Sequence, residues 1–158
     1  MSQVMPYVDV CIANEEDASD VFGIHAANTD VTKGALDKDG YVSVAKQLAE
    51  RFGCAKVAIT LRTSLSASDN LWAGMLYDGE AHFSREYPVH IVDRVGGGDS
   101  FAAGLIYALL KGEEAQGAIE FAVAASCLKH TIEGDFNMVG ETQVRALAGG
   151  DGSGRVQR

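Results

Sequence analysis

The chain has 158 residues, a length that suits one domain of modest size. It carries 13 lysine and arginine residues against 22 aspartate and glutamate residues, and the formal net charge of −9 argues against a surface built for nucleic acid or for an anionic membrane. Hydrophobic residues make up 47% of the chain, too many for a disordered protein, and no apolar run approaches the ~18 residues of a membrane span.

The first part of the chain predicts a strand followed by two helices. Residues 8–13 form a β-branched apolar run that is typical of a buried strand. Asn14 is a favoured N-cap, and the acidic residues after it suit the positive end of a helix that would stop at Gly23. Residues 25–39 are polar and are expected to form a surface loop. Apolar residues at helical spacing then predict a second helix over residues 40–52.

The middle of the chain predicts strands. Residues 56–61 read as a second strand, and the polar, serine-rich residues 62–70 are expected to form a loop. Residues 71–77 and 83–92 are again typical of strands, and an Asp-Gly hairpin turn lies between them. A proline within the later strand indicates an edge position.

The last part predicts three helices, over residues 100–110, 113–131 and 141–148. Strands separated by helices imply an α/β layer with a largely parallel sheet, to which the hairpin adds antiparallel character at one edge. We therefore expect one α/β domain over residues 1–148, followed by a polar, glycine-rich tail over residues 149–158.

The segment between the last predicted strand and the helix after it contains the most informative motif. Gly96, Gly97 and Gly98 allow a ligand to approach the backbone, and N–H groups at a helix N-terminus form an anion site. Asp99 would repel a bound phosphate unless it accepts the proton of a hydroxyl that attacks that phosphate. The alternative is a tight turn followed by a helix-capping aspartate, and the pattern alone favours neither interpretation.

Residues 93–101, Asp-Arg-Val-Gly-Gly-Gly-Asp-Ser-Phe, resemble the Asp-Thr-x-Gly-Ala-Gly-Asp-x-Phe signature of the ribokinase-like (pfkB-type) carbohydrate kinases. Residues 12–18 are similar to the family's Asn-x-x-Glu block, and residues 57–61 to its nucleotide-binding strand. Residues 60–70 and 130–137 look most like the 2-keto-3-deoxygluconate kinase branch. The resemblance covers essentially the whole chain. It implies the C-terminal half of a ribokinase-like three-layer αβα core.

The resemblance also implies catalytic roles. The signature aspartate is the family's catalytic base, so Asp99 would take the proton of the acceptor hydroxyl as that hydroxyl attacks the γ-phosphate of ATP. Gly96, Gly97 and Gly98 would form the anion hole that stabilises the transferring group. Asp93 is expected to shape the loop, with a monovalent cation site nearby as the alternative.

The same resemblance implies where ATP and Mg²⁺ bind. Asn14 would contact the phosphate–Mg²⁺ region. The family's glutamate is Asp17 here, which leaves open whether Asp17 or Glu16 organises the Mg²⁺ waters. Read from the residues alone, this acidic segment is an ordinary first helical turn. The further nucleotide-binding residues that the resemblance implies are Thr60, Arg62, Ser64 and Ser126. The alternatives are a flexible polar loop for the first three and helix packing for Ser126.

The acceptor implied by the resemblance is a sugar acid, 2-keto-3-deoxygluconate, which would be converted to its 6-phosphate. Asp99 and Asp135 would contact it. Family members run to roughly twice this length, and their N-terminal half supplies a lid and most of the acceptor pocket. We therefore expect an incomplete fragment with very weak turnover, and self-association through an uncovered sheet edge and helix face.

Three other interpretations stay open. The first is a kinase of another sugar or of a nucleoside, the second is a non-catalytic nucleotide-binding module, and the third is a structural fragment with no nucleotide affinity. The small-molecule partners expected are ATP and the sugar acid, with no nucleic acid and no membrane. Three well-separated cysteines, Cys11, Cys54 and Cys127, cannot form a complete disulfide framework, so reduced thiols and a cytoplasmic location are expected.

Overall fold

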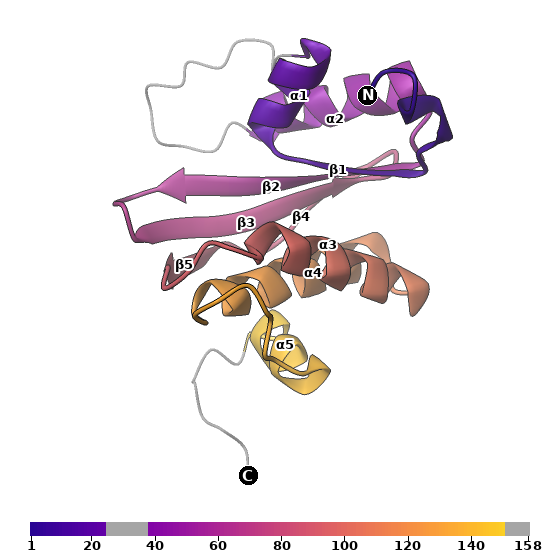
Figure 1. Cartoon of the computed structure of the whole chain (residues 1–158). Coiled ribbons are helices and arrows are strands. Elements are labelled where there is room, and N and C mark those ends of the chain that lie inside the picture. The colour runs from indigo at the N-terminus through magenta and orange to yellow at the C-terminus, as the bar shows by residue number, and fades with distance from the viewer. Residues whose placement is uncertain (25–37, 151–158) are drawn as a thin grey trace.

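The computed structural model describes residues 1–24 and 38–150, with the backbone alone for Glu15 and Glu16 (Figure 1). The expected loop at residues 25–39 falls almost entirely outside the described residues, as does the tail beyond residue 150. The elements follow in the order η1 (Met5–Tyr7), β1 (Val10–Ala13), α1 (Glu15–Phe22), α2 (Lys38–Phe52), β2 (Lys56–Ser64), β3 (Asp69–Tyr77), β4 (Ala81–Phe83), β5 (Tyr87–His90), α3 (Gly97–Leu110), α4 (Ala115–His130) and α5 (Glu141–Ala148).

The described strands form one mixed sheet in the order β1-β2-β3-β4, with β5 also paired to β3. β1 and β2 are parallel, whereas β2–β3, β3–β4 and β3–β5 are antiparallel. The predicted α/β class is confirmed. The expected parallel character, however, is limited to β1 and β2, because the connection from β2 to β3 is too short for the crossover that parallel strands need.

The extra antiparallel pairing comes from a segment that was expected to be a loop. β2 continues to Ser64, and β3 begins at Asp69, so the two strands pair over residues 57–64 and 70–77. Polar side chains hide this pairing in the sequence, because the hydrogen bonds that make it belong to the backbone. The predicted Asp-Gly hairpin turn is present, between β3 and β4.

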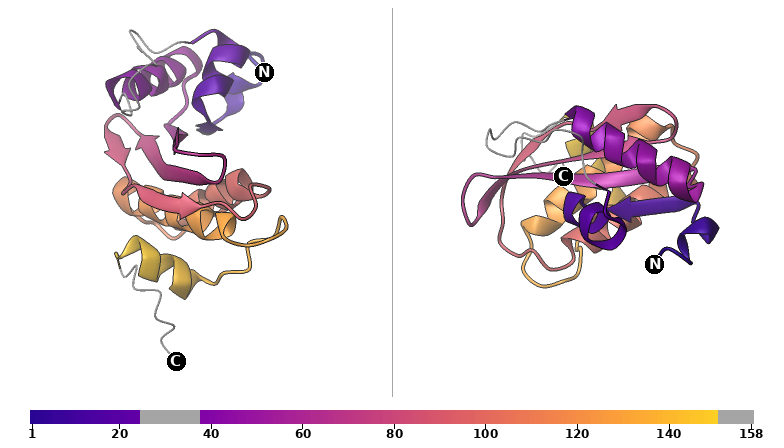
Figure 2. Two further views of the ribbon diagram at one scale, coloured as in Figure 1. Left: turned by 90° about the vertical axis from the view of Figure 1, so that its left-hand side faces the viewer. Right: turned by 90° about the horizontal axis from the view of Figure 1, so that it is seen from above.

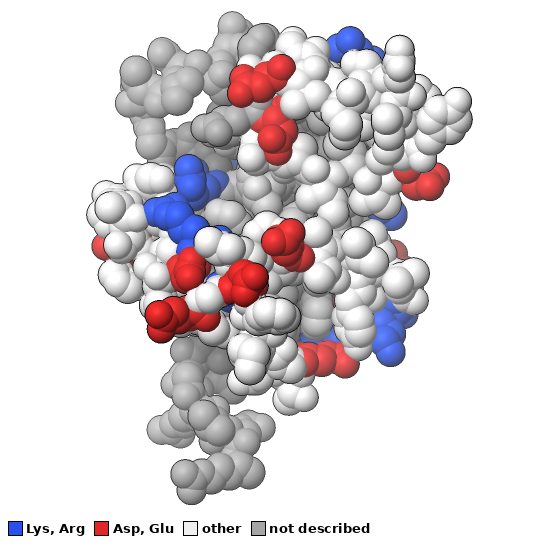
Figure 3. All heavy atoms as spheres, viewed as in Figure 1, with Lys and Arg blue, Asp and Glu red and all other residues white. Residues whose placement is uncertain are grey.

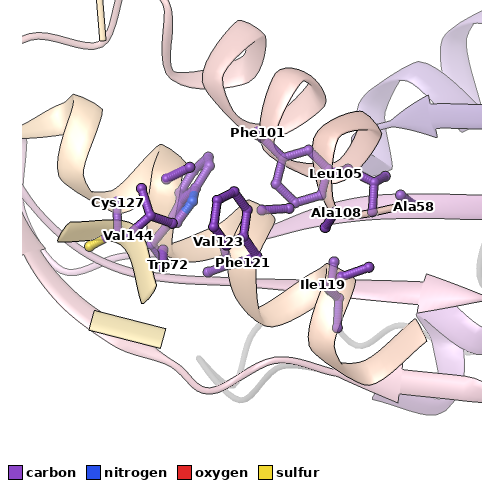
Figure 4. Close-up of a cluster of buried hydrophobic side chains, with 14 of the residues drawn as sticks. Ala58, Trp72, Phe101, Leu105, Ala108, Ile119, Phe121, Val123, Cys127 and Val144 are labelled. Atoms are coloured by element: carbon purple, nitrogen blue, oxygen red, sulfur yellow. The ribbon is translucent and has the colours of Figure 1, made fainter. Parts of the chain in front are cut away.

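Helices cover both faces of the sheet (Figures 1 and 2). α1 and α2 lie on one face, α3 and α4 lie on the other, and α5 packs beyond α4. Alternate residues of β2 divide between the two faces: Val57 and Ile59 join the core under α1 and α2, and Ala58 joins the core under α3 and α4. Figure 4 shows the second core, where Trp72 of β3 meets side chains of α3, α4 and α5.

The helix predictions are largely confirmed. Asn14 caps α1 in a reciprocal capping box, and Gly23 ends that helix in the left-handed conformation. α5 has the predicted bounds, α3 begins three residues earlier than expected, and α4 is shorter than expected. The three cysteines are buried and free, as expected. No helix within the described parts of the chain is both long and apolar enough to span a bilayer.

The strand directions bring the functional motifs to one edge of the sheet. β5 runs antiparallel to β3, and β3 runs antiparallel to β2, so β1, β2 and β5 all point the same way. Their carboxyl ends lead to Asn14, to the β2–β3 turn and to the glycine loop at residues 93–98. Ligands of α/β proteins bind at this edge of the sheet.

Candidate functional site

The glycine loop leads directly into the first turn of α3. Gly96 adopts φ +81°, a left-handed conformation, and a Cβ there would lie 2.2 Å from the carbonyl oxygen of Asp135. At Gly97 a Cβ would meet the imidazole of His130 at 2.6 Å. At Gly98, in contrast, a Cβ would have open space around it, and the residue is exposed. The loop is therefore packed from below and open above, as an anion site at a helix N-terminus must be.

Asp93 builds this loop, as expected. Its Oδ1 accepts from the N–H of Val95 and its Oδ2 from the N–H of Gly134, both at 3.0 Å. These bonds, with the nearby Lys129 ammonium, hold the pKa of Asp93 below its ordinary value. The carboxylate therefore joins the glycine loop to the loop after α4. The adjacent Arg94 donates to the carbonyl of Ala67, which ties the glycine loop to the β2–β3 turn as well.

The last turns of α4 form the floor of the glycine loop. Ser126 is fully buried, and its hydroxyl donates to the carbonyl of Gly97 at 2.8 Å. This contact supports the loop from beneath, and the expectation that Ser126 contacts the nucleotide stays a prediction. Lys129 is also fully buried and donates to the carbonyl of Ile132. His130, expected to be a surface or structural residue, lies with its ring beneath Gly97.

Asp99 lies in the first turn of α3, immediately beyond the three glycines. Its side chain is exposed and forms no hydrogen bond or ion pair with the parts of the chain that the structure describes. An aspartate that only capped the helix would accept from nearby backbone N–H groups, yet the N-cap position is Gly96, and it has no side-chain cap. The carboxylate is thus free to accept a proton from a bound group.

The nucleotide-binding candidates of β2 share one face of the sheet. Thr60, Arg62 and Ser64 alternate with buried residues and point to the same side as Ala58, which is the side of α3 and α4. Arg62 is opposite Trp72 in the β2–β3 register, and Trp72 contacts His130 under the glycine loop. Arg62 is exposed. The hydroxyl of Ser64, two residues or ~7 Å farther along the strand, donates to Asn70 Oδ1.

The candidate Mg²⁺ residues lie at the end of β1. Asn14 Oδ1 accepts from the N–H of Asp17, and Asp17 Oδ2 accepts from the N–H of Asn14. One oxygen of the Asp17 carboxylate remains without a partner among the described residues. Carboxylate and amide oxygens are the ligands that Mg²⁺ prefers, so the donor set fits this ion. The side chain of Glu16 lies outside the described part. No cluster of three or more metal-ligating side chains occurs within the described residues.

Asp135 lies on the far side of the glycine loop. Its main-chain oxygen closely approaches Gly96, while its side chain is exposed. The structure therefore places Asp135 beside the loop that carries Asp99. The exposed Phe136 follows it, in the loop that Asp93 holds through Gly134. Figure 3 shows basic and acidic side chains interspersed on this side of the molecule rather than an extended basic area.

Four buried side chains near the loop, each of which carries a polar group, were not predicted as parts of a site: Asn70, Trp72, Lys129 and His130. The side-chain N–H groups of Asn70 and Trp72 have no acceptor among the described residues. Nothing in the local sequence of Asn70 or Trp72 distinguishes these two residues, because their neighbours come from distant elements. The Lys-His pair at the end of an apolar helix was the one available signal, since such residues favour a helix C-terminus.

Comparison with known proteins agrees with this geometry. Residues 1–139 match the pfkB family carbohydrate kinase model, and the chain therefore belongs to the pfkB family of carbohydrate kinases. It is 46% identical to the solved 2-dehydro-3-deoxygluconokinase of Thermotoga maritima, with a TM-score of 0.86. A solved pfkB family carbohydrate kinase of Listeria grayi is 34% identical, with a TM-score of 0.78 over 93% of this chain and 43% of that one.

A curated relative, the 2-dehydro-3-deoxygalactonokinase of Haloferax volcanii, is 28% identical over 150 residues, which is 94% of this chain and 41% of that protein. The Thermotoga structure is likewise matched over 94% of this chain and 43% of its own. The chain thus spans about two-fifths of the length of these relatives.

Proposed function

We propose that this chain supplies the nucleotide-binding and catalytic part of an ATP-dependent kinase whose acceptor is 2-keto-3-deoxygluconate and whose product is the 6-phosphate. The observation that carries the proposal is the carboxylate of Asp99, which has no partner among the described residues and follows directly after an open glycine loop at the start of α3. The similarity to the 2-dehydro-3-deoxygluconokinase of Thermotoga maritima supports this acceptor.

The chemistry follows from the position of Asp99. Its carboxylate accepts the proton of the primary hydroxyl of the sugar acid while that oxygen forms a bond to the γ-phosphorus of ATP. The bond between this phosphorus and the bridging oxygen breaks, and ADP leaves with the bonding electrons. The N–H of Gly98 would face the charge on the transferring group, where stabilisation reduces the barrier most, while the N–H of Gly97 donates to the carbonyl of Arg94 and closes the turn beneath it.

ATP would lie along the edge formed by β2 and the glycine loop. Thr60, Arg62 and Ser64 share the face that borders this loop and can contact the ribose and phosphates. Mg²⁺ would be held near the end of β1 by Asn14 and by an acidic residue of the first turn of α1, and it would neutralise phosphate charge there.

The acceptor would lie between Asp99 and Asp135, which flank the glycine loop. A galactonate acceptor is the alternative, since the Haloferax relative is a 2-dehydro-3-deoxygalactonokinase. Another sugar, a nucleoside, or binding of nucleotide without catalysis are the remaining alternatives. The enzyme would act in the cytoplasm, where buried free cysteines stay reduced.

Two measurements test the proposal. Calorimetric titration with Mg·ADP should give saturable binding with one site per chain, and failure to bind would remove the nucleotide site. A coupled assay with ATP, Mg²⁺ and each sugar acid identifies the acceptor. Turnover by this chain alone should be very weak, because the relatives use more than twice its length and an acceptor that is not held in place reacts slowly. Ordinary turnover would contradict that expectation.

A further inference from the structure

His130 contacts both ends of the glycine loop. Its main-chain oxygen accepts from the N–H of Val92 at 2.8 Å and from the N–H of Asp93 at 3.3 Å, where the chain enters the loop. Its side chain lies under Gly97, where the chain leaves the loop for α3. One residue at the end of α4 thus fixes the entry and the exit of the candidate anion site.

The orientation of the imidazole is fixed by its neighbours. His130 is 4% exposed, and its Nδ1 lies 2.8 Å from the carbonyl oxygen of Ser126. That oxygen can only accept, so Nδ1 carries the proton. The edge of the ring meets Trp72 at 4.6 Å between ring centroids. Burial lowers the pKa of His130, which keeps the ring neutral at pH 7 and leaves Nε2 without a proton.

The unprotonated edge of the ring is the surface on which Gly97 rests. A Cβ at Gly97 would lie 2.6 Å from Nε2 and 2.8 Å from Cε1 of His130. A Cβ at Gly98, one residue along, would meet nothing within 4 Å. The ring therefore determines how deeply the first turn of α3 can sit, and with it the position of the N–H groups that would face a phosphate.

We propose that His130 is a positioning residue for phosphoryl transfer: its imidazole sets the height of Gly97, and through Gly97 it places the N–H of Gly98 and the carboxylate of Asp99. This role rests on the proposed function. It acts through the loop, since Gly97 separates the ring from the open side of the site.

A double-mutant cycle tests the contact directly. Gly97→Ala should weaken Mg·ADP binding about tenfold, because the added methyl displaces the loop from the ring. His130→Asn keeps a donor for the Ser126 carbonyl but removes Cε1 and Nε2, so it makes room for that methyl. The double variant should therefore bind at least about threefold more tightly than the product of the two single effects predicts.

Gly98→Ala combined with His130→Asn is the matched control, and its two effects should multiply with no coupling. His82→Asn, in β4, should leave the affinity unchanged. Amide NMR resonances of Gly98 and Asp99 should shift in His130→Asn without nucleotide, while the melting temperature of a folded variant reports structural loss separately.

Coupling between positions 97 and 130 in affinity and in the amide shifts supports the proposal. Multiplicative effects, or amides of Gly98 and Asp99 that do not move in His130→Asn, would overturn it. If the unaltered chain binds no Mg·ADP, the proposed function fails, and the amide shifts of Gly98 and Asp99 in His130→Asn still decide whether His130 positions the loop.

Discussion

Asp93 and Asp99 lie six residues apart and differ in how many hydrogen bonds their carboxylate oxygens accept. Both oxygens of Asp93 accept from backbone N–H groups, whereas Asp99 has no partner among the described residues. A carboxylate that already accepts two hydrogen bonds is a poor base, because protonation would break them. These contacts therefore favour Asp99 over Asp93 as the base that we propose.

Replacement of Asp99 by Asn should remove catalysis and preserve binding. In a catalytically complete protein that contains this chain, turnover should fall by roughly 10²–10⁴-fold, the usual contribution of a general base. Mg·ADP affinity should change by less than about twofold, since the amide occupies the same volume. Steady-state kinetics and calorimetry measure the two quantities. Asp20→Asn, in α1, is the matched control, and substantial turnover by Asp99→Asn would show that another group accepts the proton.

Replacement of Asp93 by Asn should reduce stability in a pH-dependent way. The backbone N–H partners of Asp93 lower its pKa in the folded state. Its contribution to the stability of the protein is therefore fully present above the ordinary aspartate pKa, and it is lost as the pH falls toward the lower pKa of the folded state. Asp93→Asn should melt at a lower temperature than the parent chain at pH 7, and the difference should shrink below ~pH 4. A melting difference that is constant down to pH 3 would contradict this role.

The Asn14 cap and the bond from Val95 to Asp93 could be predicted from local sequence, since each joins residues that lie within three positions of each other. His130 and Ser126 could not. Their function depends on Gly97 and Trp72, which are remote in the chain and reach them only after α4 packs on the sheet. A local sequence pattern can predict a hydrogen bond within one turn, but it cannot predict which distant residue will pack against a buried ring.

At the scale of elements, the packing of α3 on α4 holds the site in place. Gly104 lets the two helices approach: a Cβ there would lie 3.1 Å from Ala122 Cα and 3.2 Å from Ala125 Cβ. Since the limiting atom at Ala122 belongs to the backbone, neither helix can yield without moving as a whole. The small residues Ala122 and Ala125 of α4 form this contact.

Two glycine-to-alanine changes should therefore have opposite effects. Gly104→Ala should destabilise the protein by about 1–2 kcal/mol, because overpacking outweighs the gain in helix propensity. Gly117→Ala, on the exposed side of α4 beside the flexible end of Glu113, should stabilise it by about 0.5–1 kcal/mol. Chemical denaturation measures both free energies of unfolding. Equal signs for the two variants would show that the α3–α4 distance is not limited by Gly104.

The helices and strands could be predicted from the sequence where apolar and polar side chains follow a clear periodic spacing. α5 shows clear apolar spacing and has the expected bounds. The outer half of β2 shows no such pattern, since Arg62, Thr63 and Ser64 are polar on both faces. Its strand conformation comes from backbone pairing with β3, and backbone groups are the same in every residue.

At the scale of the whole molecule, the edge strand β1 has one side that pairs with no other described strand. β1 pairs with β2 alone among the described strands, and Ile12 of β1 is 37% exposed. On α3, Ile106 and Leu110 are exposed as well. An unpaired edge and uncovered apolar side chains favour association, which is consistent with the self-association that we propose for this chain.

Sedimentation velocity over a range of concentrations should detect this association. Ile12→Lys places a charge on the edge strand and should shift the distribution toward the monomer, as should Leu110→Lys on α3. Met138→Lys, an equally exposed apolar position in the loop after α4, is the control and should leave the distribution unchanged. A parent chain that stays monomeric at all concentrations would contradict the proposal.

The contact between Trp72 and His130 also provides an optical reporter. Trp72 is the single tryptophan of the chain, and its indole meets the imidazole that supports the glycine loop. All tryptophan emission therefore originates next to the floor of the candidate site. A ligand that shifts Gly97 would also shift the ring on which Gly97 rests, and this displacement would alter the emission of Trp72. Ligand occupancy can thus be followed by intrinsic fluorescence, without a label and without turnover.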